Sequence, residues 1–284
     1  MASCISETAE FMEEQGIHVA KLPVISLAKL RENEQAELAL LDEAASNVGF
    51  FYLDLRGDYK GERVLAHLPA IQRLVESYFG QPEEVKAKDA RFDIKAWQDL
   101  GWKRGYGGES FEISRDEMTL PVESIPQLPQ LWQNEWERVT EIASDCDDAC
   151  LTLLKCLAAN LSVHHQPHSP SDTGLKVVLH PSVAKKSDAP DGWHTDDGTL
   201  TLLFYKDWGL NAFLPNVNSW AFTPPMEGCA LINVANSLQK LSGGRFHSAK
   251  HRVTQPFDGS KNRYYFSYFL RPETVLVEKW NSDN

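Results

Sequence analysis

Two different spacings of apolar residues divide the chain near residue 170. Up to about residue 165, apolar residues recur mainly at helical spacing, with a few short alternating runs between them. From about residue 174 onward they fall into short β-rich runs separated by turn residues. We therefore expect a mostly helical first part, 1–165, followed by a β-rich core over 174–275.

The first part is expected to combine helices with short strands. Residues 23–27 (PVISL) predict an early strand, and the segment ENEQAELALLDEAASNVG predicts a helix that ends at Gly49. The aromatic run GFFYLDLRG predicts a second strand, and another helix is expected over 62–80. Segment 91–126 is rich in Gly, aromatic and charged residues, which is typical of a loop that covers a site. One long helix is expected over about 128–162.

The second part contains seven short β-rich runs. This density of short strands predicts an antiparallel sandwich or barrel. Because the chain has no internal repeat, low-complexity tract or obvious linker, we expect one domain over 1–284, mainly β with flanking helices. The runs are LKVVLH, TLTLLF, LNAFLP, SWAFTP, CALINVA, SAKHRVTQ and RYYFSYFL.

Composition disfavours several classes of protein, namely nucleic-acid-binding, membrane-spanning and secreted proteins. The 284 residues are 42% hydrophobic and carry a formal net charge of -12, which disfavours nucleic acid and anionic membranes as partners. No run approaches the roughly 20 apolar residues of a membrane helix, and the acidic start MASCISETAEFMEEQG is unlike a signal peptide. The cysteines are odd in number and lack zinc-site spacing, so we expect reduced thiols in a cytoplasmic protein. They are Cys4, Cys146, Cys150, Cys156 and Cys229.

One histidine and two acids precede the TLTLLF run, in GWHTDDGTLTLLF. On a strand, residues two apart face the same way, so His194 and Asp196 are expected to share a face. A second histidine, His251, stands in the later run SAKHRVTQP. Two imidazoles and one carboxylate on one side of a metal are the ligands of non-haem Fe(II) oxygenases, which leave positions open for oxygen and substrate.

A second polar set lies on the last run, NRYYFSYFL. With a period of two, Arg263, Tyr265 and Ser267 share a face, and a guanidinium suits a carboxylate because its planar fork makes two charge-assisted hydrogen bonds. Taken alone, a His-x-Asp is usually a turn, and an isolated histidine or arginine is usually structural or solvated. The order and spacing of all these residues on expected strands favours a site.

The ordered motifs resemble the isopenicillin N synthase-like branch of the iron and 2-oxoglutarate-dependent oxygenases, particularly its fungal members. The resemblance implies a double-stranded β-helix, or jelly roll, with Fe(II) at His194, Asp196 and His251 and the distal carboxylate of 2-oxoglutarate at Arg263. The matching segments are LPVISL, SNVGFFYLDLRG, HTDDGTLTLLF followed by GLNAF, MEGCALINVANSLQKLSGGRFHSAKHRV and NRYYFSYFLRPE.

The chain departs from the family pattern beside Arg263. Tyr265 stands where the family usually has serine, and His180 stands where a tyrosine usually precedes a proline. These two residues and Ser267 are therefore candidates for binding the cosubstrate. His180 is either a hydrogen-bond donor or acid-base group near the iron, or a core-edge histidine bonded to backbone.

The resemblance implies an enzyme that uses dioxygen and 2-oxoglutarate to hydroxylate, desaturate or cyclise a small metabolite, releasing succinate and carbon dioxide. Within the family, an alternative is an oxidase of the isopenicillin N synthase type, which needs no 2-oxoglutarate and in which Arg263 holds the substrate carboxylate. A jelly-roll binding protein without activity is disfavoured by the intact ligand set. The basic residues Lys103 and Arg104 are candidates to meet an acidic group of the substrate.

Overall fold

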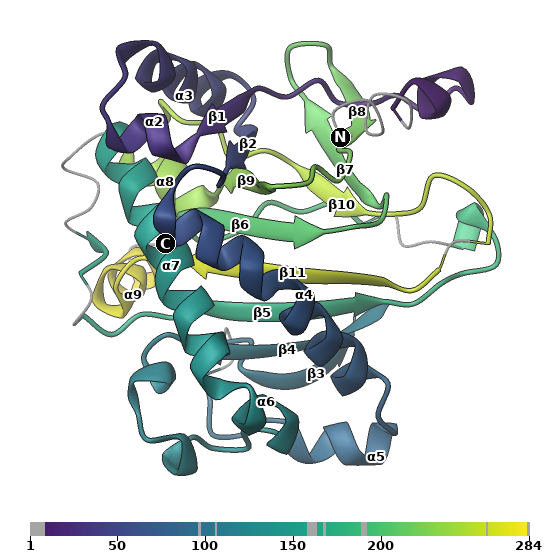
Figure 1. The fold of residues 1–284 in the computed structure, drawn as a ribbon, viewed down its shortest axis with the longest axis vertical. Helices are drawn as coiled ribbons and strands as arrows, with labels where there is room; N and C mark the ends of the chain where they lie inside the picture. The colour runs from purple at the N-terminus through teal and green to yellow at the C-terminus, as the bar shows by residue number, and fades with distance from the viewer. Residues whose placement is uncertain are drawn as a thin grey trace.

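Eight strands form one large sheet in the computed structural model, which describes residues 9–95, 98–105, 107–157, 164–166, 169–188, 192–259 and 261–282. Their order across the sheet is β1-β2-β9-β6-β11-β5-β4-β3 (Figure 1). The pairs are antiparallel except for β1 with β2. The strands are β1 Val24–Ser26, β2 Phe50–Asp54, β3 Gly101–Gly105, β4 Gly108–Ser114, β5 Gly174–His180, β6 Leu200–Tyr205, β9 Cys229–Val234 and β11 Arg263–Leu270.

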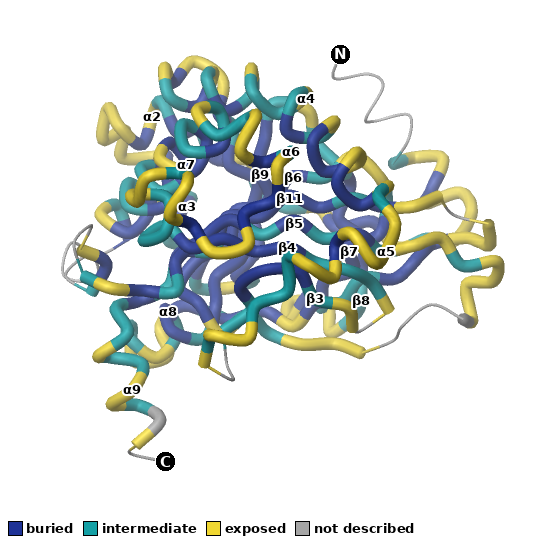
Figure 2. Tube along the Cα trace, turned by 90° about the horizontal axis from the view of Figure 1, so that it is seen from below, coloured by how far each residue is buried: buried dark blue, intermediate teal, exposed yellow. Residues whose placement is uncertain are grey.

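A small antiparallel sheet packs against part of the large one. It has the order β10-β7-β8, from His251–Val253, Leu210–Leu214 and Ser219–Phe222. A buried apolar cluster joins β7 of the small sheet to β2 and β9 of the large sheet. Figure 2 shows the buried strands of the large sheet between α4 and α7 on one side and β8 on the other. Two packed antiparallel-rich sheets with flanking helices confirm the expected jelly roll.

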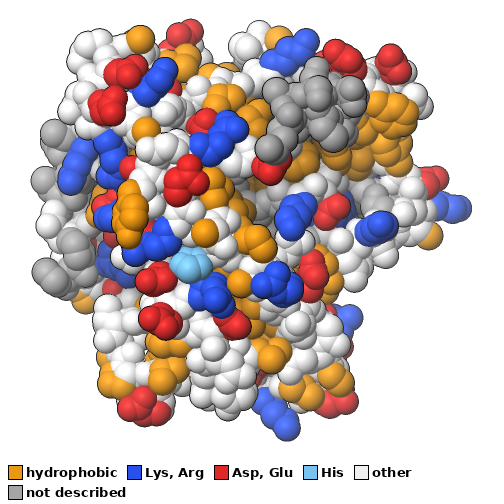
Figure 3. Space-filling view, in the orientation of Figure 1, with side chains coloured by type: hydrophobic (Ala, Val, Ile, Leu, Met, Phe, Trp, Pro, Cys, Tyr) orange, Lys and Arg blue, Asp and Glu red, His pale blue; other side chains and the backbone are white. Residues whose placement is uncertain are grey.

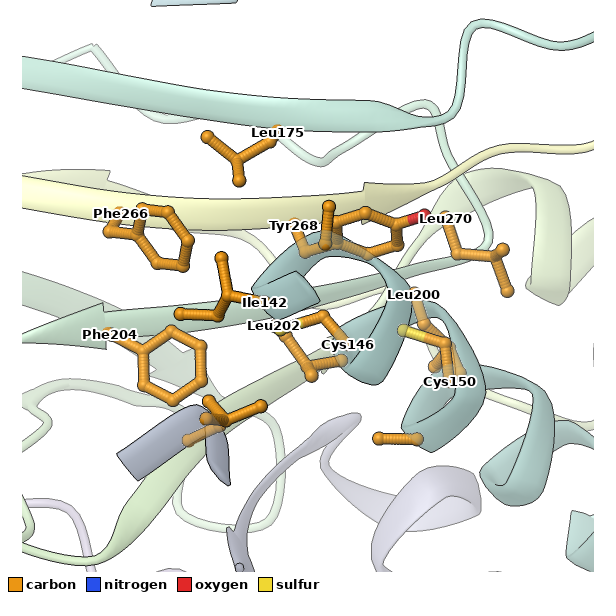
Figure 4. Close-up of a cluster of buried hydrophobic side chains, with 14 of the residues drawn as sticks. Ile142, Cys146, Cys150, Leu175, Leu200, Leu202, Phe204, Phe266, Tyr268 and Leu270 are labelled. Atoms are coloured by element: carbon orange, nitrogen blue, oxygen red, sulfur yellow. The ribbon is translucent and has the colours of Figure 1, made fainter. Parts of the chain in front are cut away.

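Helices α4 (Tyr59–Phe79) and α7 (Trp136–Leu157) cover the opposite face of the large sheet (Figure 1). The apolar residues of α7 recur at helical spacing, so they form one stripe that faces the strands. Figure 4 shows this contact, in which side chains of α7 meet apolar side chains of β5, β6 and β11. The labelled residues are Ile142, Cys146, Cys150, Leu175, Leu200, Leu202, Phe204, Phe266, Tyr268 and Leu270.

Shorter helices surround this core. Acidic and basic side chains are interspersed over the helix-bearing side of the molecule (Figure 3). Among the described residues, none of the helices has the length and apolar character needed to cross a membrane. The remaining helices are α2 Leu27–Arg31, α3 Gln35–Asn47, α5 Glu83–Lys86, α6 Gln130–Asn134, α8 Asn236–Leu241 and α9 Thr274–Ser282, with 3-10 turns at Ala87–Asp89, Glu117–Thr119, Val122–Ser124 and Lys186–Asp188.

Gly49 ends the predicted helix and lets the chain enter β2. Its φ is +75°, a left-handed conformation that favours glycine. A Cβ at this position would stand 1.9 Å from the carbonyl oxygen of His247. The close approach places β2 beside β9, where its neighbour Phe50 pairs with Asn233.

Two predictions for the first part were wrong. Segment 91–126 contains the hairpin β3–β4, which forms the edge of the large sheet; its apolar alternation is limited to Phe111 and Ile113 of β4, and Gly107 (φ +78°) makes the tight turn. The helix expected over 128–162 is two helices, α6 and α7, because Glu135 leaves the helical conformation between them (φ -110°, ψ 13°). Residues 158–163 lie outside the described residues.

Candidate metal centre and the adjoining polar face

The three predicted metal ligands meet in space. One ligand atom from each of His194, Asp196 and His251 lies within 4.8 Å of the others, and this is the one such group found in the described part of the chain. Nε2 of His194 is 3.6 Å from Oδ1 of Asp196, and Nε2 of His251 is 3.5 Å from the same oxygen. The backbones of the two histidines bond to each other in both directions, each N–H···O at 2.9 Å. The cluster offers two nitrogens and one oxygen to one ion.

Two side chains of the large sheet orient the carboxylate. Oδ2 of Asp196 accepts hydrogen bonds from Thr201 of β6 (2.7 Å) and Asn233 of β9 (2.8 Å), which leaves Oδ1 toward the imidazoles. Burial by itself raises the pKa of Asp196, but the charge of His251 and the hydrogen bonds to the carboxylate outweigh it and lower the pKa well below its usual range. The group is therefore an ionised ligand at neutral pH.

His251 is buried and held in one orientation. Its Nδ1 lies 3.3 Å from the carbonyl oxygen of Ala249, so Nδ1–H donates to that oxygen, and Nε2 is the atom that would lose its proton and bind a metal. The edge of Phe50 packs at 5.7 Å between ring centroids. The side chain of His194, in contrast, is 57% exposed, which places the accessible side of the centre at this ligand.

The local structure of the first motif differs from the prediction. His194 forms an isolated bridge with His251, and Asp196 lies in the loop before β6, so neither is part of a continuous strand. The two ligands converge because the backbone bridge and the bonds to Oδ2 fix them separately. Asp197 turns away, and its carboxylate accepts from the amide of Asn236 at 3.0 Å.

Arg263, Tyr265 and Ser267 are all buried on one face of β11, as the period of two predicts. Residues directly opposite in a sheet share a face, so the register places His180 of β5 beside Arg263 and Tyr205 of β6 beside Tyr265. This face is opposite to the one that packs on α7. It belongs to the same side of the large sheet as Thr201 and the metal centre.

Two donors on this face lack partners. Nη1 of Arg263 donates to the carbonyl of Thr254, but Nε of Arg263 and the hydroxyl of Tyr265 have no hydrogen-bond partner among the described residues. A buried polar atom left without a partner costs about 1–3 kcal/mol. The geometry therefore suits an acceptor group placed against both atoms, and a carboxylate meets that requirement.

Gly209 makes room for the tyrosine. A Cβ at this position would stand 2.4 Å from the Tyr265 hydroxyl and 3.0 Å from Cδ of Arg263. The half-buried His180 packs its ring edge-on against Tyr265 at 5.7 Å. Burial, and then the positive charge of Arg263, lower the pKa of His180 to about 4, so its imidazole is neutral at pH 7.

The basic residues predicted for a lid make other contacts. Arg104 pairs with Glu83, and Nζ of Lys103 lies 2.9 Å from a carboxylate oxygen of Asp99. Sequence reasoning also missed Thr201 and Asn233. Each is a single buried polar residue inside an otherwise apolar strand, and that contrast was the signal available for them.

Comparisons with known proteins agree with this geometry. The family model described as 2OG-Fe(II) oxygenase superfamily matches residues 155–272. The 2-oxoglutarate-dependent dioxygenase FG08081 of Gibberella zeae is 30% identical over 277 residues, covering 91% of this chain and 82% of the relative. The 2-oxoglutarate-dependent dioxygenase gloE of Glarea lozoyensis is 30% identical, covering 91% and 82%. The predicted resemblance to fungal oxygenases is thereby confirmed.

Solved structures support the same fold. A full-length Neurospora crassa protein, crystallised in complex with alpha-KG and 5-formyluracil, superposes with a TM-score of 0.73 at 21% identity, covering 88% of this chain and 84% of that one. The dioxygenase for auxin oxidation 1 from Arabidopsis thaliana, solved with 2-oxoglutarate, gives a TM-score of 0.72 at 20% identity and covers 90% and 94%.

Proposed function

This chain belongs to the 2OG-Fe(II) oxygenase superfamily, and from that premise we propose which residues carry its activity as a 2-oxoglutarate-dependent dioxygenase. His194, Asp196 and His251 hold Fe(II). The ionised carboxylate and the free Nε2 of His251 fit a divalent cation. Bound iron and 2-oxoglutarate supply the oxidising chemistry, in which dioxygen is consumed, 2-oxoglutarate becomes succinate and carbon dioxide, and a C–H bond of the substrate is cleaved.

Arg263 and Tyr265 bind the distal carboxylate of 2-oxoglutarate. The single observation that carries this assignment is the pair of unpartnered buried donors, Nε of Arg263 and the Tyr265 hydroxyl, which lie together over Gly209. The phenol replaces the smaller serine expected at this position, and Gly209 provides the space. Ser267 and the neutral His180 share this face of the sheet.

The protein's own contribution is orientation and charge. Thr201 and Asn233 turn one oxygen of Asp196 toward the metal, and the backbone bridge fixes the two imidazoles relative to each other. Burial of Arg263 strengthens its attraction for a carboxylate, because charges interact more strongly away from water. These features position the cosubstrate before the reaction begins.

The substrate is a small metabolite that is oxidised in the cytoplasm. The net charge of -12 supports a partner other than nucleic acid. Four cysteines are free thiols, which supports a reducing compartment; Cys4 lies outside the described residues.

The oxidase alternative, with Arg263 on the substrate carboxylate, is not favoured, because relatives that match most of the chain are named 2-oxoglutarate-dependent dioxygenases.

Anaerobic titration of the Fe(II)-loaded protein with 2-oxoglutarate tests these assignments. We expect a weak visible charge-transfer band that saturates in the wild type and is lost in Arg263→Ala. Arg245→Ala is the matched control, because Arg245 is an exposed arginine that pairs with Asp42 far from this face, and it should keep the band. A wild-type protein that binds iron without forming the band, or an Arg263→Ala variant that titrates normally, contradicts the assignment.

A further inference from the structure

A second polar group lies on the same side of the large sheet, one strand further from the metal. Lys176 of β5 is directly opposite Ser267 of β11, and Glu112 of β4 is directly opposite Lys176. Because opposite residues share a face, both side chains lie on the face of Arg263 and Tyr265. Their sequence neighbours Leu175, Val177, Phe111 and Ile113 belong instead to the core under the helices.

Lys176 and Glu112 belong to a partly buried, nearly balanced set of charges. Nζ of Lys176 is 2.7 Å from Oδ2 of Asp99, and Nη1 of Arg271 is 2.5 Å from Oε1 of Glu112. Burial lowers the pKa of Lys176, but Glu112 and Asp99 outweigh it and raise the pKa, so the ammonium stays charged. The side chain of Glu112 is only 1% exposed.

The hydrogen bonding of the two residues is incomplete. Oε2 of Glu112 is buried and has no hydrogen-bond partner among the described residues. Nζ of Lys176 lies 3.6 Å away, beyond a normal hydrogen bond. An ammonium has three N–H donors, and within the described part of the chain the hydrogen bond of Lys176 goes to Asp99. An unused acceptor therefore stands beside unused donors.

These groups are near the metal centre but separate from the proposed cosubstrate carboxylate. The guanidinium of Arg271 lies 4.8 Å from the ring centroid of Phe269. Phe269 is directly opposite Thr201 in the sheet, and Thr201 donates a hydrogen bond to Asp196. Neighbouring strands are about 4.8 Å apart, so Lys176 lies one strand and Glu112 two strands to the side of β11. A molecule over β4 and β5 would therefore lie next to the proposed 2-oxoglutarate site on β11 and would approach the metal centre from that side, past Arg271, on which the charge of Asp196 also acts.

We propose that Glu112 and Lys176 recognise the substrate that is oxidised, through a hydrogen-bond donor and an acceptor on adjacent atoms of that molecule. This inference rests on the proposed function. The donor of the substrate binds Oε2 of Glu112, and its acceptor binds Nζ of Lys176. Two chemical sources offer such a pair: the N–H and C=O edge of a cyclic amide, or the ammonium and carboxylate of an α-amino acid. Because the surrounding charges nearly cancel, the site favours a neutral or zwitterionic molecule.

Calorimetric binding to the anaerobic Fe(II)–2-oxoglutarate protein tests the inference with two probes, 2-pyrrolidinone and L-alanine. We expect one of them to bind, and we expect Lys176→Met and Glu112→Gln each to weaken that binding at least about tenfold, the loss expected for a hydrogen bond to a charged group. The affinity for 2-oxoglutarate, followed by the charge-transfer band, should stay unchanged in both variants. Glu83→Gln, an exposed carboxylate on α5, is the control and should bind the probe normally.

Each outcome of the binding experiment either supports one of the two chemical sources or overturns the proposal. Binding of 2-pyrrolidinone alone supports the amide source, and binding of L-alanine alone supports the amino acid source. Binding of neither probe, or equal binding by wild type and both variants, overturns the proposal and leaves the two residues as a structural ion-pair group. Glu112→Gln removes the charged partner of Arg271 and can unfold, whereas Lys176→Met keeps that pair and provides the test on its own. Failure of the proposed function would appear separately, as loss of the 2-oxoglutarate band in the wild type.

Discussion

The two faces of β11 differ in composition although their residues alternate along one strand. The face toward α7 carries Phe266, Tyr268 and Leu270, which fill the core with apolar groups and, in Tyr268, with a phenol whose hydroxyl binds Asp147 at 2.8 Å. The other face carries Arg263 and Tyr265, which are equally buried but keep unpartnered polar atoms. Burial alone therefore does not separate the structural residues of this strand from the functional ones.

The two faces of β11 differ in whether their buried polar atoms have hydrogen-bond partners. A face built only for stability satisfies its polar groups or has none, because each unpartnered atom destabilises the fold. A face built to hold a ligand keeps donors whose partner arrives with that ligand. Substitutions on the two faces should consequently affect different measurements.

Phe266→Ala should have the largest effect, and only on stability. Truncating a buried Phe removes transfer free energy and leaves a cavity, so we expect the free energy of unfolding to fall by about 3–5 kcal/mol. Urea unfolding measures this change. The folded variant should bind Mn(II) and 2-oxoglutarate with wild-type affinity; a weakened affinity would show that the two faces are coupled.

Asn233→Ala should weaken metal binding by about 10- to 100-fold, because it removes a bond that orients Asp196. Titration with Mn(II) measures the affinity. Asn236→Ala is the matched control, since its amide bonds Asp197, which is not a ligand. Equal losses in both variants would argue against a specific role for Asn233.

Gly209→Ala should weaken binding of 2-oxoglutarate by about tenfold, because the added methyl group displaces Tyr265 and Arg263. Combining it with Tyr265→Ser should recover much of the affinity, since the smaller side chain removes the closest contact. The charge-transfer band provides both affinities. If the double variant binds no better than Gly209→Ala, the crowding explanation is wrong.

The smallest effect concerns pH. The folded-state pKa of His180 is about 4, against an ordinary value of 6.5, so between these values the unfolded chain binds more protons than the native protein. Stability should therefore fall as pH decreases from about 6.5 to 4 and should not change through His180 above that window. His180→Gln should show a shallower decrease in urea unfolding across the same range. An unchanged slope would contradict the lowered pKa.

Much of the fold and the convergence of the three candidate ligands could be predicted from the sequence, because the signals were local. The run RYYFSYFL has a period of two, so the shared face of Arg263 and Tyr265 follows from the sequence alone. The metal ligands stand beside strong strand patterns, and their order matched a family. Hairpin β3–β4 was missed because Trp102 is the one large apolar residue of β3 and the alternation in β4 is limited to Phe111 and Ile113.

The residues that complete the site could not be predicted in the same way. Thr201 and Asn233 reach Asp196 because β6 pairs with β9, and Glu112 meets Lys176 because β4 pairs with β5. Such register is a property of the folded sheet and leaves no pattern within one segment. The need for glycine at position 209 likewise becomes visible only in the folded protein, where Tyr265 and Arg263 lie close to it.

The reciprocal backbone bonds between His194 and His251 join β10 of the small sheet to the loop that precedes β6 of the large sheet, at the point where the candidate metal ligands meet. The intervening chain runs through β6, β7, β8 and β9, so a metal ion held by both imidazoles closes one long loop of the polypeptide. An ion that binds the native form and not the unfolded chain stabilises the native form by mass action. Removal of the metal that we propose here should therefore lower the free energy of unfolding as well as the catalytic activity.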